Sequence, residues 1–141
     1  MAAGGCFCGK VRIQLNGQPL TTGLCYCDDC RKLTGAPFTY NLLVKTTDVE
    51  ISGNPKEVAK AADSGNDIRN YFCPDCGTPL YGVKIKDGEP DGIIVLRSGI
   101  MDDPRLLRRK PDAEIFTDRR PPWLAPVEGA AQFSGMLPLN D

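Results

Sequence analysis

Hydrophobic and polar residues alternate along several short stretches of the chain. Val11, Ile13 and Leu15 are separated by polar residues, which is the two-residue period of a strand with one buried face. An Asn-Gly turn signal follows directly. The same reasoning predicts strands over residues 10–15, 37–44, 57–61, 68–72, 79–85, 92–98 and 113–117. Their shortness, and the glycine and proline between them, predict a mainly β fold of short antiparallel strands.

Helix signals are sparse. One helix is predicted over residues 28–34, with Asp28 as its N-cap and Gly35 at its left-handed stop. Residues 101–112 read as a connection with one turn of helix. Residues 119–126 are expected to be extended, because their prolines exclude a regular helix.

Length and composition narrow the class of protein. A chain of 141 residues suits one domain, which we expect to span residues 1–141. The net charge of -1 does not favour nucleic acid or anionic membranes as partners. The N-terminal sequence MAAGGCFCGKVRIQL lacks the features of a signal peptide, and no stretch approaches the roughly 18 apolar residues of a membrane span. The expected location is the cytoplasm.

Seven cysteines are the chemically informative residues. An odd number without an export signal argues against a disulfide framework and favours metal binding. They fall into three groups: Cys6 and Cys8; Cys25, Cys27 and Cys30; Cys73 and Cys76. Cysteines two apart on a strand face the same side, and a C-x-x-C loop lets two thiolates converge on one ion.

The spacing suggests how the groups combine, because a structural zinc site takes four protein ligands. The simplest division keeps the middle group together as a three-cysteine cluster (Cys25, Cys27 and Cys30). The outer groups then form a closed four-cysteine cluster (Cys6, Cys8, Cys73 and Cys76). An alternative zinc ribbon joins Cys27 and Cys30 to Cys73 and Cys76. Residues 31–72 between those pairs exceed the roughly 15 to 20 residues typical of a ribbon, which disfavours it.

Zinc on three cysteines has an open fourth position, which distinguishes a catalytic from a structural site. Three thiolates make zinc a weak Lewis acid, so hydrolysis is not its natural use. An incoming thiol would instead lose its proton there and become a nucleophile, which predicts a small thiol substrate. Such a complex is negatively charged, so cations such as Arg31 and Lys32 would stabilise it.

The absence of histidine excludes Ser-His-Asp and Cys-His catalysis. Proton transfer would then use Tyr26, Asp28, Asp29, a lysine or water. Helix capping is the favoured role of the two aspartates.

Four motifs together resemble a known family. They are GGCFCGKV (4–11), CYCDDCRKLTGAPF (25–38), YFCPDCGTPLY (71–81) and EIFTDRRPPWL (114–124). They resemble the glutathione-dependent formaldehyde-activating enzyme family, which includes centromere protein V. The resemblance implies a zinc-binding β-tent fold with two zinc ions, one structural on the four-cysteine cluster and one catalytic on the three-cysteine cluster. It also implies a carbon-sulfur lyase that adds glutathione to formaldehyde, or reverses that addition.

The resemblance is incomplete, because many relatives have histidine where this chain has Tyr26. Glutathione's carboxylates could meet Arg31, Lys32, Arg69 or Arg97. Trp123 is expected to pack in the core. A non-catalytic, zinc-stabilised interaction module is the alternative function, and it would require a side chain such as Asp28 at the fourth position. A methionine sulfoxide reductase would need a spare redox cysteine, and this division leaves none.

Overall fold

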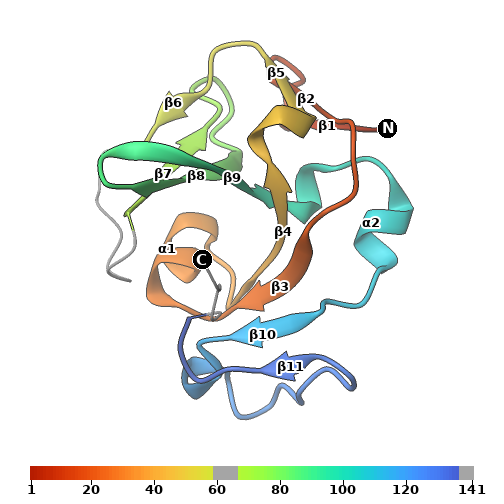
Figure 1. Cartoon of the computed structure of the whole chain (residues 1–141), viewed down its shortest axis with the longest axis vertical. Coiled ribbons are helices and arrows are strands. Elements are labelled where there is room, and N and C mark those ends of the chain that lie inside the picture. Colours follow the sequence, from red (N-terminus) through yellow and green to blue (C-terminus); the bar gives the residue numbers. More distant parts are fainter. Residues whose placement is uncertain (59–66, 137–141) are drawn as a thin grey trace.

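The computed structural model describes residues 1–58 and 67–136, whose strands form two sheets. The small sheet has the order β1–β2–β5: β1 (Ala2–Gly5), β2 (Arg12–Leu15) and β5 (Val49–Ser52). The large sheet has the order β11–β10–β3–β4–β9–β8–β7–β6: β11 (Ala131–Gln132), β10 (Ala113–Ile115), β3 (Thr21–Cys25), β4 (Thr39–Lys45), β9 (Glu89–Arg97), β8 (Pro79–Lys86), β7 (Asp67–Phe72) and β6 (Lys56–Glu57). Figure 1 shows the large sheet curving around α1 (Asp28–Thr34).

The mainly β prediction is confirmed. Six of the seven predicted strands are present. The strand predicted over residues 57–61 coincides with β6 only at Glu57, Val58 is not in a strand, and residues 59–61 lie outside the described part of the chain. The sheet is not wholly antiparallel, because β10 pairs in parallel with both β3 and β11. Strands β1, β3, β5 and β11 were not predicted. β1 consists of alanine and glycine and β3 contains a glycine, so their intrinsic strand preference is weak.

The helical predictions largely hold. α1 has the predicted bounds, and Gly35 ends it with a φ of 71°. The N-cap prediction was wrong by one residue: Cys27 caps the helix, because its side chain accepts a hydrogen bond from the Cys30 amide at 3.4 Å. The single helical turn after Met101 is α2 (Pro104–Arg108).

The remaining helical pieces are 3-10 turns at Thr46–Asp48, Ser98–Ile100 and Thr117–Arg119. The extended prediction for residues 119–126 was wrong, because the amide of Leu124 donates to the carbonyl of Pro121 and closes a turn. None of the helices in residues 1–58 and 67–136 is long and apolar enough to span a membrane.

The large sheet uses its two faces differently. On one face, the cross-strand pairs of β4 and β9 join Leu42 to Leu96 and Val44 to Ile94, and all four side chains are buried in the main core. Val11 and the apolar residues of β2 pack into the same core. The opposite face carries the pair formed by Asn41 and Arg97, which lines a cavity. That the domain spans residues 1–141 stays a prediction.

Candidate metal centres

The four-cysteine cluster lies where two hairpin turns meet. Its four Sγ atoms all lie within 4.8 Å of one another. Cys8 Sγ is 3.6 Å from Cys6 Sγ and 3.8 Å from Cys73 Sγ. Because zinc-sulfur bonds are about 2.3 Å long, sulfurs at the corners of a zinc tetrahedron are about 3.8 Å apart. The sulfur positions therefore fit a tetrahedral zinc ion.

Neighbouring groups orient these sulfurs. The Val11 amide donates to Cys6 Sγ at 3.2 Å, and the Thr78 hydroxyl lies 3.1 Å from Cys76 Sγ. Hydrogen bonds from Thr78 lower the pKa of Cys76 to about 5, which favours the thiolate that binds metal. Thr78 also accepts a hydrogen bond from the amide of Phe7, so the two cysteine-bearing turns are joined by more than their sulfurs.

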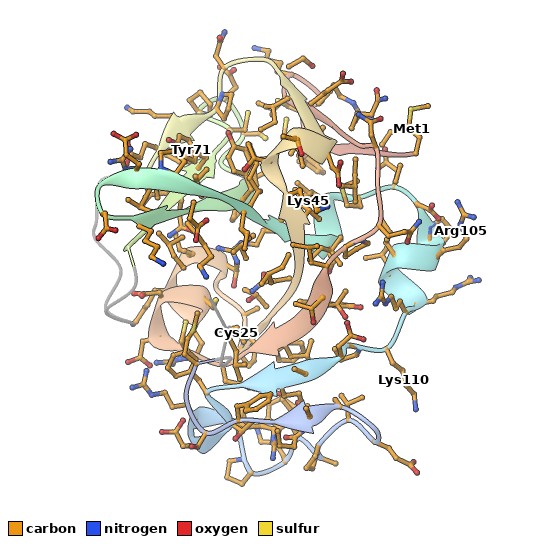
Figure 2. The ribbon with its side chains drawn as sticks, viewed as in Figure 1. Met1, Cys25, Lys45, Tyr71, Arg105 and Lys110 are labelled. Atoms are coloured by element: carbon orange, nitrogen blue, oxygen red, sulfur yellow. The ribbon has the colours of Figure 1, made fainter. Side chains whose placement is uncertain are left out.

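The three-cysteine cluster lies at the junction of β3 and α1. Cys25 is the last residue of β3, Cys27 is the N-cap of α1, and Cys30 is in the first helical turn. Figure 2 shows Cys25 at the end of β3 beside the helix. The three sulfurs lie within 4.8 Å of one another, and all three residues are buried. Among the described residues, no carboxylate or fourth cysteine joins this group.

The three thiols influence one another strongly. Contacts with Cys25 and Cys27 lower the pKa of Cys30, and the positive charge of Arg97 and the hydroxyl of Thr39 act in the same direction. Contacts with Cys27 and Cys30 raise the pKa of Cys25. Three adjacent thiolates repel one another, whereas a divalent cation offsets that repulsion. The donor set therefore suits a metal ion.

Asp28 and Tyr26, which the sequence suggested for the fourth zinc position or for proton transfer, have other partners in the structure. The Asp28 carboxylate contacts Arg31 at 2.8 Å and Arg119 at 3.4 Å, and it is not part of the three-cysteine group. Tyr26 is buried, and its hydroxyl donates to Glu114 Oε1 at 2.5 Å. Burial and that contact raise the pKa of Tyr26 to about 12. The Tyr26 hydroxyl therefore keeps its proton and donates it in a hydrogen bond to Glu114.

Of the four cationic residues considered for glutathione binding, one lies at the cavity, and the tryptophan lies at the surface. Lys32 is exposed, and Arg69 forms a partly exposed ion pair with Glu57 at 3.9 Å. Arg97 alone of the four cations lines the cavity beside the cysteines. The core prediction for Trp123 was wrong, since 73% of this residue is exposed.

The three-cysteine cluster opens onto a cavity of about 90 Å³. Most of its wall is hydrophobic: Leu33, Leu43, Ile68, Val95, Ile115 and Phe116. Asp29 also lines it. Its polar wall includes Arg97, which donates from Nη1 to Asn41 Oδ1 at 2.8 Å and from Nη2 to Asn70 Oδ1 at 3.1 Å.

Sequence reasoning missed the polar residues around the cavity. Thr39 and Asn41 lie two apart on β4, and Thr39 is the direct cross-strand partner of Cys25. Their alternation with apolar residues was visible within the predicted strand, but the face they share with Cys25 required the strand register. The Thr39 hydroxyl is buried and lies near Cys30, whose pKa it lowers.

Comparison with known proteins gives three findings. Residues 1–119 match the family described as "Glutathione-dependent formaldehyde-activating enzyme". Proteins of Emericella nidulans and Sordaria macrospora, each named "Putative glutathione-dependent formaldehyde-activating enzyme", are 32% and 28% identical over 55% and 52% of this chain. Those matches cover only 39% and 31% of the two relatives. A crystal structure of a Rhodobacter sphaeroides protein has the same fold, with a TM-score of 0.55 and 22% identity over 77% of this chain and 97% of that one.

Proposed function

Because the chain belongs to the glutathione-dependent formaldehyde-activating enzyme family, we propose that it is a zinc-dependent carbon-sulfur lyase. It joins a small thiol such as glutathione to a small electrophile such as formaldehyde, or separates them. One observation carries the proposal: three buried sulfurs converge beside a cavity, and no carboxylate or fourth cysteine from the described residues joins them.

The two clusters have different roles in this proposal. The four-cysteine cluster holds a structural zinc ion that fastens the turn between β1 and β2 to the hairpin of β7 and β8. Cys25, Cys27 and Cys30 hold the catalytic zinc ion. Zinc held by these cysteines would lower the pKa of an incoming thiol and so keep it nucleophilic at neutral pH.

The reaction needs only the two substrates. The thiol sulfur forms a bond to the carbonyl carbon, and the π electrons of the C=O bond move to the oxygen. That oxygen takes one proton, so the proton released by the thiol is returned and a hydroxymethyl thioether results. The reverse reaction breaks the same carbon-sulfur bond.

We infer that Thr39 assists the oxygen. Its backbone lies directly across from Cys25, and its buried hydroxyl lies close enough to Cys30 to lower the pKa of that thiol. A hydroxyl in that position can donate a hydrogen bond to the oxygen as negative charge develops on it. The apolar wall formed by residues such as Leu33 and Phe116 keeps the surroundings low in dielectric, which strengthens this interaction.

The test measures carbon-sulfur bond formation directly. Zinc-loaded protein is mixed with glutathione and ¹³C-formaldehyde, and NMR exchange spectroscopy gives the rate of S-hydroxymethylglutathione formation. We expect acceleration over the uncatalysed rate, loss of it in Cys27→Ser, and a reduction of about a hundredfold or more in Thr39→Val. Thr34→Val is the matched control, because that hydroxyl donates to the Cys30 carbonyl within α1 instead.

The result that would contradict the proposal is equally direct. If zinc-loaded protein gave no acceleration with glutathione and any of a panel of small aldehydes, the chain would not be this lyase. A zinc-stabilised module without catalysis would then be the better account.

A further inference from the structure

Arg97 is a buried cation whose described hydrogen bonds go to neutral side chains, while its charge also acts on the nearby Cys30 thiol. Only 9% of the residue is exposed, and its guanidinium donates hydrogen bonds to the side-chain oxygens of Asn41 and Asn70. Its Nε–H is buried and has no acceptor among the described residues. No carboxylate within residues 1–58 and 67–136 pairs with its guanidinium, whereas Arg12, Arg31 and Arg105 each pair with an aspartate.

The backbone holds Arg97 in this position from both sides. Asn41 is its direct cross-strand partner on β4, so their side chains lie on the same face of the sheet. Asn70 lies across from Gly82. A Cβ at Gly82 would lie 2.9 Å from Asn70 Oδ1, so the glycine leaves the space from which Asn70 reaches the guanidinium. The arrangement fixes the orientation of Arg97 without neutralising it.

An arginine in this state is suited to an anion. Burying a charge is unfavourable unless a counter-charge offsets it. The negative charge that Arg97 meets at Cys30 would be shared with a metal ion, so a bound anion lowers the cost that remains. A guanidinium has five N–H donors, and the two asparagines use only two of them. The planar fork that remains matches a carboxylate, which accepts two parallel hydrogen bonds.

We propose that Arg97 binds the carboxylate of the thiol substrate, and that the chain therefore selects acidic thiols. This inference rests on the proposed function, since its ligand is the thiol used there. Arg97, Cys25 and Cys30 line the same cavity, with Val95 and Ile115 among the hydrophobic residues around them. A ligand with its sulfur at the cysteines and its carboxylate at Arg97 would lay a short hydrocarbon segment along that wall.

The test compares acids with neutral amides of the same shape. Isothermal titration calorimetry on zinc-loaded protein measures Kd for 3-mercaptopropionate and 3-mercaptopropionamide, and separately for the thiol-free pair butyrate and butyramide. We expect each acid to bind at least about tenfold more tightly than its amide, as loss of a charged hydrogen-bonding partner typically produces. Arg97→Gln should remove this preference, and Arg97→Lys should retain part of it.

Two further variants make the comparison specific. Arg12→Gln is the matched control: Arg12 lies on β2, its side chain is 48% exposed, and it pairs with Asp102, so the acid preference should be unchanged. Asn70→Ala removes one of the two amides that orient Arg97 and should reduce the preference. It also provides a test if Arg97→Gln does not fold.

The outcomes separate this inference from the proposed function. Equal binding of acid and amide by the unaltered protein, or an unchanged preference in the Arg97 and Asn70 variants, would overturn the carboxylate site and leave the lyase proposal standing. An Arg97-dependent preference for butyrate, together with no carbon-sulfur bond formation from glutathione and aldehydes, would support the carboxylate site and remove the lyase proposal.

Discussion

Replacing Glu114 on β10 by glutamine tests how the C-terminal segment stabilises the three-cysteine cluster. The side chain is completely buried. Oε1 accepts from the hydroxyl of Tyr26 at 2.5 Å and lies 3.5 Å from Nη1 of Arg120. Oε2 accepts from the Val127 amide at 2.8 Å and from Nε2 of Gln132 at 2.6 Å. Since Tyr26 stands between Cys25 and Cys27, Glu114 connects the C-terminal strand to the cysteine cluster.

The expected loss of unfolding free energy follows from the hydrogen-bond donors that lose their acceptor. Glu114→Gln keeps the size of the side chain, but its NH₂ group must face at least one of the donors that now converge on the carboxylate. Breaking a buried ion pair by removing one partner costs about 3–5 kcal/mol. Tyr26→Phe removes a single hydrogen bond to a charged group, so about 1.5–3 kcal/mol is expected.

Urea denaturation of the zinc-loaded protein provides the assay, with the Tyr26→Phe/Glu114→Gln double variant completing a cycle. Because the two groups share a hydrogen bond, their effects should be non-additive by about 1 kcal/mol or more. Tyr81→Phe is the control: Tyr81 is buried, but no hydrogen bond from its hydroxyl to another described residue is present. Additive effects, or a loss below about 1 kcal/mol in Glu114→Gln, would refute the role assigned to this carboxylate.

The same variant predicts a pH dependence. Burial opposes ionisation of Glu114, but hydrogen bonds from Tyr26, Gln132 and Val127 and the charge of Arg120 outweigh it, so its pKa lies below the ordinary 4.5. A lowered pKa in the folded state stabilises the protein at pH values above the ordinary pKa, and this stabilisation is lost as the pH falls through the folded-state pKa. The difference in unfolding free energy between the unaltered protein and Glu114→Gln should therefore shrink below about pH 4.5.

Three further predictions concern the metals and the cavity. Cys73→Ser should lose zinc and give the circular dichroism spectrum of an unfolded chain, since structural zinc contributes on the order of 10 kcal/mol to folding. Cys27→Ser should keep the spectrum of the folded protein and lose one zinc ion, as measured by elemental analysis. Titration with a chelator should remove the zinc held by three cysteines before the zinc held by four, as followed with a zinc-sensitive dye; simultaneous release would contradict this. Gly82→Ala should destabilise by about 1–3 kcal/mol and weaken butyrate binding, because its Cβ would lie 2.7 Å from Ile68 Cγ2 and 2.9 Å from Asn70 Oδ1. Gly99→Ala, where an added Cβ meets nothing within 4 Å, should do neither.

Spacing along the chain was enough to group the cysteines, for a physical reason. Cys25, Cys27 and Cys30 are separated by so few residues that a strand end followed by one helical turn brings their sulfurs together. The outer pairs could be joined only by assuming four ligands for a structural zinc, and the structure does bring those four sulfurs together. It does not bring Cys27 and Cys30 to the C-x-x-C pair at Cys73, as the zinc ribbon alternative required.

The surroundings of the three-cysteine cluster were harder to predict from the sequence, because they depend on contacts between segments that are distant along the chain. Tyr26 was a candidate for proton transfer until its partner, Glu114 on a distant strand, was known. Likewise, nothing local to Arg97 distinguishes it from Arg69, yet one is buried against two amides and the other pairs with Glu57 near the surface.

Strand β4 shows where sequence pattern stops being informative. Its alternation of polar and apolar residues identifies a strand with one buried face, and Leu42 and Val44 do fill the core. The usual inference assigns the other face to solvent. Here Thr39 and Asn41 are buried as well, and Asn41 lines the cavity together with Leu33 of α1 and Ile115 of β10. Buried polar residues on that face therefore indicate a site, because nothing in core packing requires a hydroxyl, an amide and a guanidinium there.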